Sequence, residues 1–332
     1  MEAKLVAALP EGEAWQFEPK WDGFRCLAYR DGGEVRLLSK AGKPLGRYFP
    51  EVVAMLEGLR ADRFLLDGEL IVPVGETLSF GALQARLHPA ESRIRKLSAE
   101  TPAQLMLFDC LQLGDEQLLE APLRVRRERL EAFHREHGRA DLLLSPISFT
   151  AEEGAEWLAR SGGALDGVVA KARDERYRPG ERAMLKVKQH RTADCVVGGF
   201  RYGTASRAVG SLLLGLYGNE GLLHHVGFTS GLAAEDRPAL TVRLEALVEP
   251  PGFTGRAPGG PSRWSTERSA QWQPLRPELV VEVRYDHVTA ARFRHGTSFL
   301  RWRPDKAPRQ CTYDQIEEEA RPAVVAAALK GR

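Results

Sequence analysis

The octet Glu-Pro-Lys-Trp-Asp-Gly-Phe-Arg at residues 18–25 combines residue types that suit phosphate chemistry. If it forms a strand and a turn, Lys20 and Asp22 point to the same face, because strand side chains alternate with a period of two. Gly23 would permit a tight turn, and Arg25 would offer a planar fork to a phosphate or a ribose. An exposed lysine beside an ordinary Asp-Gly turn explains the octet equally well.

Lys20 can act as a nucleophile only as a neutral amine. An ordinary lysine has a pKa of about 10.4 and is almost wholly protonated at neutral pH. Desolvation or neighbouring cations favour the neutral amine, so this hypothesis requires other cations around Lys20.

A second group of cations stands at Lys186-Val187-Lys188, where two lysines at strand spacing project the same way. Parallel ammonium groups repel each other, which indicates an anion between them, such as a triphosphate or a nucleic-acid backbone. An edge strand protected by lysines is the alternative. The segment 301–306 is another basic patch, which is typical either of a solvated face or of a nucleic-acid groove.

Acidic and aromatic candidates lie between these groups. Asp67 and Glu69 have alternate spacing, so both carboxylates could reach ribose hydroxyls or a divalent ion, although a strand that ends in a turn is the commoner explanation. Asp166 and Lys171 lie at opposite ends of a strand of only a few residues. Phe108 could stack on a base, yet an aromatic residue at the end of an apolar strand more often belongs to the core.

Length and composition limit the class of protein. The chain has 332 residues, which suggests two domains, and its 43% hydrophobic and 28% charged residues describe a globular protein. A net charge of +2 says little about nucleic acid, so local clusters must carry that inference. Four scattered cysteines form no C-x-x-C pair, which disfavours a zinc site or disulfides and favours a reducing cytoplasm. No stretch approaches the roughly 20 apolar residues of a membrane span.

The elements that must position these residues change in kind near Thr192. Before it, strand and helix signals alternate: a hairpin at 25–39, helices after Pro50 and from Pro122, and strands at 64–72, 105–113, 167–170 and 183–187. After it, strands dominate: 195–200, 211–217, 222–228, 279–285 and 298–303, with one helix at 233–247, a loop at 250–261 and a tail helix from Tyr313. Five strands with one helix fit a small, partly open barrel such as an OB-fold, and a sandwich also fits.

Seven short motifs occur in a fixed order along the chain. They resemble the collinear motifs of covalent nucleotidyltransferases, which comprise ATP-dependent DNA ligases, RNA ligases and mRNA capping enzymes. The resemblance is closest to the short bacterial ATP-dependent DNA ligases of the ligase C type, and it covers nearly the whole chain. Each motif alone is weak evidence, whereas seven in the right order and spacing are strong. The motifs are K-x-D-G-x-R at 20–25, S-K-x-G at 39–42, D-G-E at 67–69, F-D at 108–109, D-G-V-V-A-K at 166–171, K-x-K at 186–188 and R-x-D-K at 303–306.

The resemblance implies a role for each matching residue. Lys20, in the motif with Asp22, matches the nucleophile that attacks the α-phosphate of ATP and becomes a lysyl-adenylate. Glu18 matches a residue on the adenine edge, and Phe108 matches the ring on the adenine face. Arg25 and Glu69 match contacts to the ribose and the adjacent phosphate, and Asp166 with Glu69 matches the ligands of a Mg²⁺ or Mn²⁺ ion. The phosphates are matched by Lys171, Lys186 and Lys188, and the leaving pyrophosphate by Arg303, Asp305 and Lys306. The surrounding cations are expected to depress the pKa of Lys20.

Two positions depart from the pattern of many relatives. Asp166 stands where a glutamate is common, and Lys40 stands where an arginine senses the 5′-phosphate of a nick. Asp166 is one methylene shorter, and Lys40 offers a point charge in place of a fork. Both changes preserve charge, so they affect geometry and leave the reaction intact.

The resemblance also implies the architecture and the partners. We expect an α+β fold with an adenylation domain at 1–191 followed by an OB-fold domain at 192–332. The expected function is sealing of nicks in duplex DNA during repair, by a monomer associated with the nucleoid in the cytoplasm, in contact with other repair proteins. Because little chain precedes Lys20, DNA would be held by these two domains and by the loop at 253–273. An RNA ligase, a capping-type enzyme and a non-catalytic OB-fold nucleic-acid binder are the alternatives.

Overall fold

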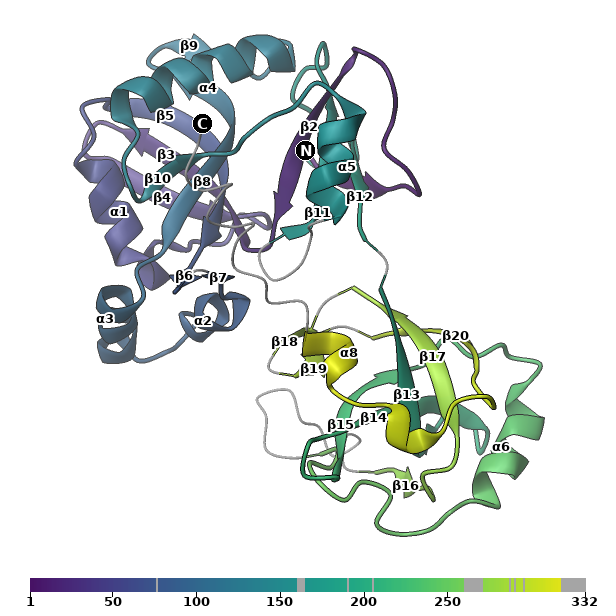
Figure 1. Cartoon of the computed structure of the whole chain (residues 1–332). Helices are drawn as coiled ribbons and strands as arrows, with labels where there is room; N and C mark the ends of the chain where they lie inside the picture. The colour runs from purple at the N-terminus through teal and green to yellow at the C-terminus, as the bar shows by residue number, and fades with distance from the viewer. Residues whose placement is uncertain are drawn as a thin grey trace. The chain divides into compact units, whose positions relative to one another are not determined.

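The computed structural model in Figure 1 describes residues 1–75, 77–159, 165–189, 191–204, 206–259, 271–286, 288–289, 291–294 and 296–317. The described chain divides into two compact units, one of residues 1–189 and one within 190–319. Each unit has its own hydrophobic core. No helix in the described part of the chain is long and apolar enough to cross a membrane.

The first unit contains two main sheets. The smaller has the order β1-β12-β11-β2, made of β1 (Ala3–Leu5), β12 (Met184–Val187), β11 (Leu165–Ala172) and β2 (Trp15–Trp21). The larger has the order β10-β8-β5-β3-β4, made of β10 (Leu142–Leu144), β8 (Gln104–Leu113), β5 (Arg63–Ile71), β3 (Phe24–Asp31) and β4 (Glu34–Ser39), with β9 (Glu116–Gln117) paired to β8. The predicted hairpin at 25–39 is therefore confirmed as β3 and β4.

Helices cover the sheets of this unit. The 15-residue helix α4 (Leu123–His137) packs on β8, and α5 (Ala151–Ala159) packs on β2 and β11, as Figure 1 shows. The predictions of helices after Pro50 and from Pro122 are confirmed by α1 (Pro50–Glu57) and α4. The sequence reading missed α5 and also α2 (Phe80–Ala85), α3 (Glu91–Glu100), the 3-10 turn at Gly46–Tyr48 and the hairpin β6–β7 (Pro73–Val74, Thr77–Leu78).

The second unit is built on one sheet of order β15-β14-β13-β17-β20, with β16 paired to β13. All five predicted strands are confirmed, with ends shifted by a few residues, and the longest is β13 (Arg191–Tyr202). The others are β14 (Val209–Tyr217), β15 (Leu223–Thr229), β16 (Gln273–Pro274), β17 (Val280–Tyr285) and β20 (Ser298–Trp302), beside a small pair of β18 (Val288–Thr289) and β19 (Arg292–Phe293).

The helix predicted at 233–247 is shorter than expected. It is α6 (Arg237–Glu245), which begins after Asp236 because Pro238 fits the first turn of a helix. The predicted tail helix begins as α8 (Asp314–Glu317), after a 3-10 turn at Pro308–Gln310, and its remainder lies outside the described residues. Residues 260–270 of the loop at 253–273, which was expected to hold DNA, also lie outside the described residues.

The sheet of the second unit does not close into a complete barrel in the described part of the chain. Its two end strands approach each other at one place, where Thr229 at the end of β15 forms a single parallel bridge with Thr297 beside β20. The hydroxyl group of Thr229 donates to the carbonyl oxygen of Thr297 at 3.0 Å. The observed architecture is an open sheet in which every pair of neighbouring strands is antiparallel.

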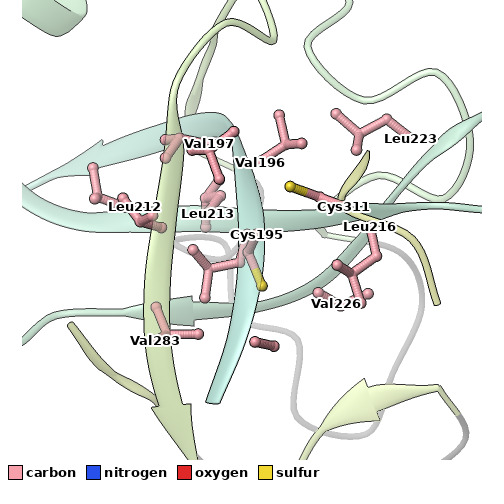
Figure 2. Packing of buried hydrophobic residues seen from close by; sticks show 14 of the residues in the cluster. Cys195, Val196, Val197, Leu212, Leu213, Leu216, Leu223, Val226, Val283 and Cys311 are labelled. Atoms are coloured by element: carbon pink, nitrogen blue, oxygen red, sulfur yellow. The ribbon is translucent and has the colours of Figure 1, made fainter. Parts of the chain in front are cut away.

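The core of the second unit consists of side chains from both faces of this sheet, since consecutive residues such as Cys195, Val196 and Val197 are all buried. Figure 2 shows Cys195, Val197, Leu213 and Val283 converging from three strands, and all four are fully buried. Burial raises the pKa of the Cys195 thiol well above its ordinary value. All four cysteines of the chain are free and buried, as expected for a protein that does not rely on disulfides.

One buried histidine should make the stability of the second unit depend on pH. Burial, together with the charges of Arg292 and Arg201, lowers the pKa of His225 to about 3. An unfolded histidine has a pKa of about 6.5, so between these values the unfolded chain binds a proton that the native chain does not. Stability is therefore fully present above pH 6.5 and falls as the pH drops toward 3.

The expected loss from His225 between pH 7 and pH 5 is about 2 kcal/mol. Urea titrations of the native chain and of His225→Gln at both pH values should give a shallower pH dependence in the variant. His224→Gln, on the neighbouring position and partly exposed, serves as the control and should keep the native slope. Equal slopes in all three proteins would contradict the prediction.

Candidate active site

The residues that the sequence singles out in the first unit surround one pocket of about 530 Å³. Its walls come from both sheets, because β1, β2, β11 and β12 contribute one side while β3, β5 and β8 contribute the other. Seven basic side chains line it against three acidic ones, which favours an anionic ligand. The predicted residues among them are Glu18, Lys20, Arg25, Lys40, Glu69, Phe108, Lys171 and Lys186.

Lys20 lies in β2 and faces the pocket with its ammonium group in an ion pair. Its Nζ is 2.6 Å from Asp166 Oδ2, and Lys188 Nζ is 2.9 Å from the other oxygen of the same carboxylate. Asp166 therefore joins two of the predicted cations. An ammonium group has no lone pair to attack with, so Lys20 must lose its proton before it can act as a nucleophile.

Lys186 lies in β12 on the wall beside Lys20. Burial, and then the positive charges of Lys20 and Lys188, lower the pKa of Lys186 below its ordinary value. Repulsion of this kind is relieved when an anion enters, because phosphate oxygens accept charge-assisted hydrogen bonds from each ammonium group. The cluster can therefore bind a polyphosphate.

The opposite end of the pocket is formed by a buried ion pair and an aromatic ring. Lys171 Nζ is 2.8 Å from Glu18 Oε1, and both side chains are at most 4% exposed. Gln16 donates to the same carboxylate at 2.8 Å. Lys171 also lies 4.7 Å from the centre of the Phe108 ring. The sequence predicted Lys171 among the phosphate-binding cations, whereas its ammonium group lies beside Glu18 and Phe108.

Arg25 lies in β3 and is held from behind by Asp67 of β5. Its Nε and Nη2 donate to the two oxygens of Asp67 at 3.0 and 2.6 Å, and Nη2 also contacts the hydroxyl group of Tyr177 at 3.1 Å. Burial and the negative charge of Asp67 raise the pKa of Tyr177, so the phenol stays protonated. Tyr177 was not among the predicted residues.

Glu69 and the turn at Asp22-Gly23 adjoin Arg25. The strand β2 ends at Trp21 and β3 begins at Phe24, so Asp22 and Gly23 form the turn between them. The backbone amide of Gly23 donates to Glu69 Oε1 at 3.1 Å. Burial raises the pKa of Glu69 to about 8, although Lys20 and Arg25 act in the opposite direction.

The turn at Gly23 tolerates no side chain. A Cβ atom there would lie 2.2 Å from the carbonyl oxygen of Leu70 and 2.7 Å from Glu69 Cγ. Gly23→Ala should therefore push β5 and Glu69 away and cost about 1–3 kcal/mol of stability. Thermal unfolding measures the loss. Gly33→Ala, in a hairpin where nothing lies within 4 Å, is the control, and an equally stable Gly23→Ala would contradict the prediction.

Lys40 lies at the margin of the pocket, in the turn that follows β4. It forms an ion pair of 2.9 Å with Glu2, and its side chain is 60% exposed. An exposed pair of this kind contributes little to stability, so Lys40 can exchange Glu2 for another anion.

The last predicted motif belongs to the second unit. Arg303 pairs with Asp305 and with Asp194 at 2.8 Å each, and Lys306 lies 3.3 Å from Asp194. The sequence analysis did not identify Asp194, whose carboxylate pairs with both Arg303 and Lys306. The feature of the sequence that could have identified Asp194 is a carboxylate within the apolar run of β13.

The acidic side chains near the pocket can bind a divalent ion only together with substrate phosphates. No group of three His, Cys, Asp or Glu side chains with metal-ligand spacing occurs among the described residues. Asp166 and Glu69 offer two carboxylates at the pocket, and Mg²⁺ usually binds through one or two carboxylates plus substrate phosphates. The residues are therefore compatible with such an ion.

Together these groups can hold a nucleoside triphosphate with a lysine beside its phosphates, the arrangement of a nucleotidyltransferase. The sequence model of the "ATP dependent DNA ligase domain" matches residues 3–188, and that of the "ATP dependent DNA ligase C terminal region" matches residues 205–306. DNA ligase C1 of Mycolicibacterium smegmatis is 46% identical, over 96% of this chain and 93% of that protein. DNA ligase C of Mycobacterium tuberculosis is 42% identical over the same shares.

Solved structures agree at the level of the fold. A structure titled for the DNA binding of Lig E DNA ligases superimposes with a TM-score of 0.56 at 17% identity, covering 91% of this chain and all of that one. The chain belongs to the ATP-dependent DNA ligase family, as a short bacterial member.

Proposed function

We propose that this protein seals nicks in duplex DNA through a lysyl-AMP formed on Lys20. The observation that carries the proposal is that Lys20 lines the same pocket as the cation Lys186 and the ring of Phe108, in a chain of the ligase family. A nucleotide that stacks on Phe108 would extend its phosphates toward Lys20.

Three transfers at one site make up the reaction. The Nζ of Lys20 forms a bond to the α-phosphorus of ATP, and the bond to pyrophosphate breaks. The AMP then passes to the 5′-phosphate of the nick, which frees Lys20. The 3′-hydroxyl group attacks that phosphate and expels AMP. Each step builds negative charge on phosphate oxygens, which Lys186 and Lys188 would stabilise.

The adenosine would lie at the Phe108 end. The carboxylate of Glu18 can accept a hydrogen bond from an exocyclic amino group, and the ammonium of Lys171 can donate to a ring nitrogen. Arg25 and Glu69 would contact the ribose and the adjacent phosphate, and Lys40 would meet the 5′-phosphate of the nick. Asp22 would hold the turn beside Lys20.

A divalent ion, Mg²⁺ or Mn²⁺, would neutralise phosphate charge during transfer. Asp166 and Glu69 would hold it. Contact of Asp166 with the ion would weaken its attraction for the Lys20 ammonium group and so favour the neutral amine.

The second unit would supply Arg303, Asp305 and Lys306 to the leaving pyrophosphate. We propose that it is an OB-fold domain at 192–332, after an adenylation domain at 1–191, and the bridge between Thr229 and Thr297 supports a nearly closed barrel. A role in DNA repair with repair proteins as partners, a monomeric state and a nucleoid-associated, cytoplasmic location complete the proposal.

The test is transfer of radiolabel from ATP to the protein, with GTP in a parallel reaction, followed by addition of nicked duplex DNA. The proposal requires labelling by ATP alone, loss of the label on adding DNA, and sealed product. Labelling by GTP, or sealing only of nicked RNA, would overturn it in favour of a capping-type enzyme or an RNA ligase.

DNA binding should depend steeply on salt, because phosphate contacts release counterions. We expect modest affinity for a nicked duplex that falls by about tenfold or more between 50 and 200 mM salt, as a few phosphate contacts require. Fluorescence anisotropy measures this dependence. Equal affinities at the two salt concentrations would contradict the prediction.

A further inference from the structure

A buried hydroxyl group lies behind Arg25 and has no part in the proposed reaction. Tyr177 stands in the segment between β11 and β12, and it is only 7% exposed. Its hydroxyl group donates to Asp67 Oδ2 at 2.8 Å and accepts from Arg25 Nη2 at 3.1 Å. One oxygen atom therefore bridges both members of the Arg25–Asp67 ion pair.

The three side chains form a closed triangle with one member at the pocket. Arg25 lines the pocket, whereas Asp67 is fully buried behind it. Two hydrogen bonds to Asp67 fix the plane of the guanidinium group. The third, to Tyr177, leaves from the same Nη2 atom and limits sliding of the guanidinium group along the carboxylate. The triangle thus determines where Arg25 can reach.

Tyr177 is itself held from the opposite side. The guanidinium carbon of Arg126, on α4, lies 5.7 Å from the centre of its ring. Arg126 also donates to the carbonyl oxygen of Glu175 at 3.1 Å, two residues before Tyr177. The backbone amide of Tyr177 donates to Leu119 at 2.9 Å. These contacts place the ring independently of any nucleotide.

We propose that Tyr177 is a positioning residue for the nucleotide, which acts by fixing the guanidinium group of Arg25 at the pocket wall. The inference rests on the proposed function, because it assumes that Arg25 contacts ATP. Tyr177 does not line the pocket, so it would act through Arg25.

Tyr177→Phe tests the inference because it removes one oxygen atom and keeps the ring under Arg126. We expect the KM for ATP in lysyl-AMP formation to rise about five- to tenfold, the ratio that matches one net hydrogen bond, with kcat changed less than about twofold. Tyr29→Phe is the matched control. It removes a hydroxyl group that contacts Asp31 in the same unit, away from the pocket, and should leave KM unchanged.

A double-mutant cycle with Arg25→Ala separates positioning from a general structural role. If Tyr177 acts through Arg25, Tyr177→Phe raises KM in the native background and leaves it unchanged when Arg25 is absent. An equal rise in both backgrounds, or none in either, overturns the inference. Arg25→Lys, which keeps a charge beside Asp67, replaces Arg25→Ala if the latter unfolds.

The two proposals fail in different ways. A native protein that takes up no AMP overturns the proposed function before the cycle begins. A native protein that takes up AMP, with a Tyr177→Phe variant of native KM, overturns only the role of Tyr177.

Discussion

Lys20→Arg should take up no AMP, while the native protein gains the mass of one AMP on incubation with ATP and Mg²⁺. Arginine keeps a positive charge beside Asp166, so the ion pair that Lys20 makes at 2.6 Å has a substitute and the fold is expected to remain. A guanidinium group stays protonated in proteins and cannot attack phosphorus. Intact-mass spectrometry reads the outcome directly, and the loss should exceed about a thousandfold in rate, as expected when the nucleophile of covalent catalysis is removed.

Lys43→Ala is the control for this experiment, because Lys43 is an exposed lysine of the same unit that lies outside the pocket. It should take up AMP as the native chain does. Adding nicked DNA should then discharge the adduct from the native chain and from the control. An adduct on Lys20→Arg would remove Lys20 as the nucleophile.

Arg126→Ala should produce the largest loss of stability among single changes in the first unit. Arg126 and Asp109 are both almost fully buried and joined by two hydrogen bonds of 2.7 and 3.1 Å. Removing the arginine leaves an uncompensated carboxylate in the interior, which costs about 3–5 kcal/mol. Two backbone carbonyl oxygens also lose their donor. Urea titration measures the loss.

Two comparisons make this second prediction specific. Arg129→Ala, on the same helix but in an exposed pair with Glu116, should cost less than about 1 kcal/mol. Replacing Arg126 by Met and Asp109 by Leu together should cost less than Arg126→Ala alone, because no charge is then left buried. A double variant as unstable as the sum of its single changes would contradict this account.

Local sequence patterns predicted the elements in which the order of apolar and polar residues indicates which side chains are buried. The strands β5, β8 and β14 consist mainly of apolar residues, and the structure has them within about two residues of the predicted ends. Helix α3 was missed because it buries only Ile94, so its apolar periodicity is too weak to detect.

Polar residues inside strands were harder to interpret because their partners are distant in sequence. Asp194 lies in an apolar run, and its partner Arg303 follows 109 residues later. The carboxylate of Glu18 can be buried because it pairs with Lys171, which follows 153 residues later. The motif order named eight residues that line the pocket, yet it gave no information on Tyr177 or on which anion Lys20 contacts.

The antiparallel pairing of β2 with β11 also bears on how the chain is made. Lys20 pairs with Gly167, so the strand that carries Lys20 lacks its partner strand until residues 165–172 have been synthesised. At 5–20 residues per second, this interval is roughly 10–30 s. Throughout it, the buried residues Phe17 and Trp21 belong to an unpaired strand, a state that invites aggregation. Lys20 is thus translated well before the strand that completes its side of the pocket.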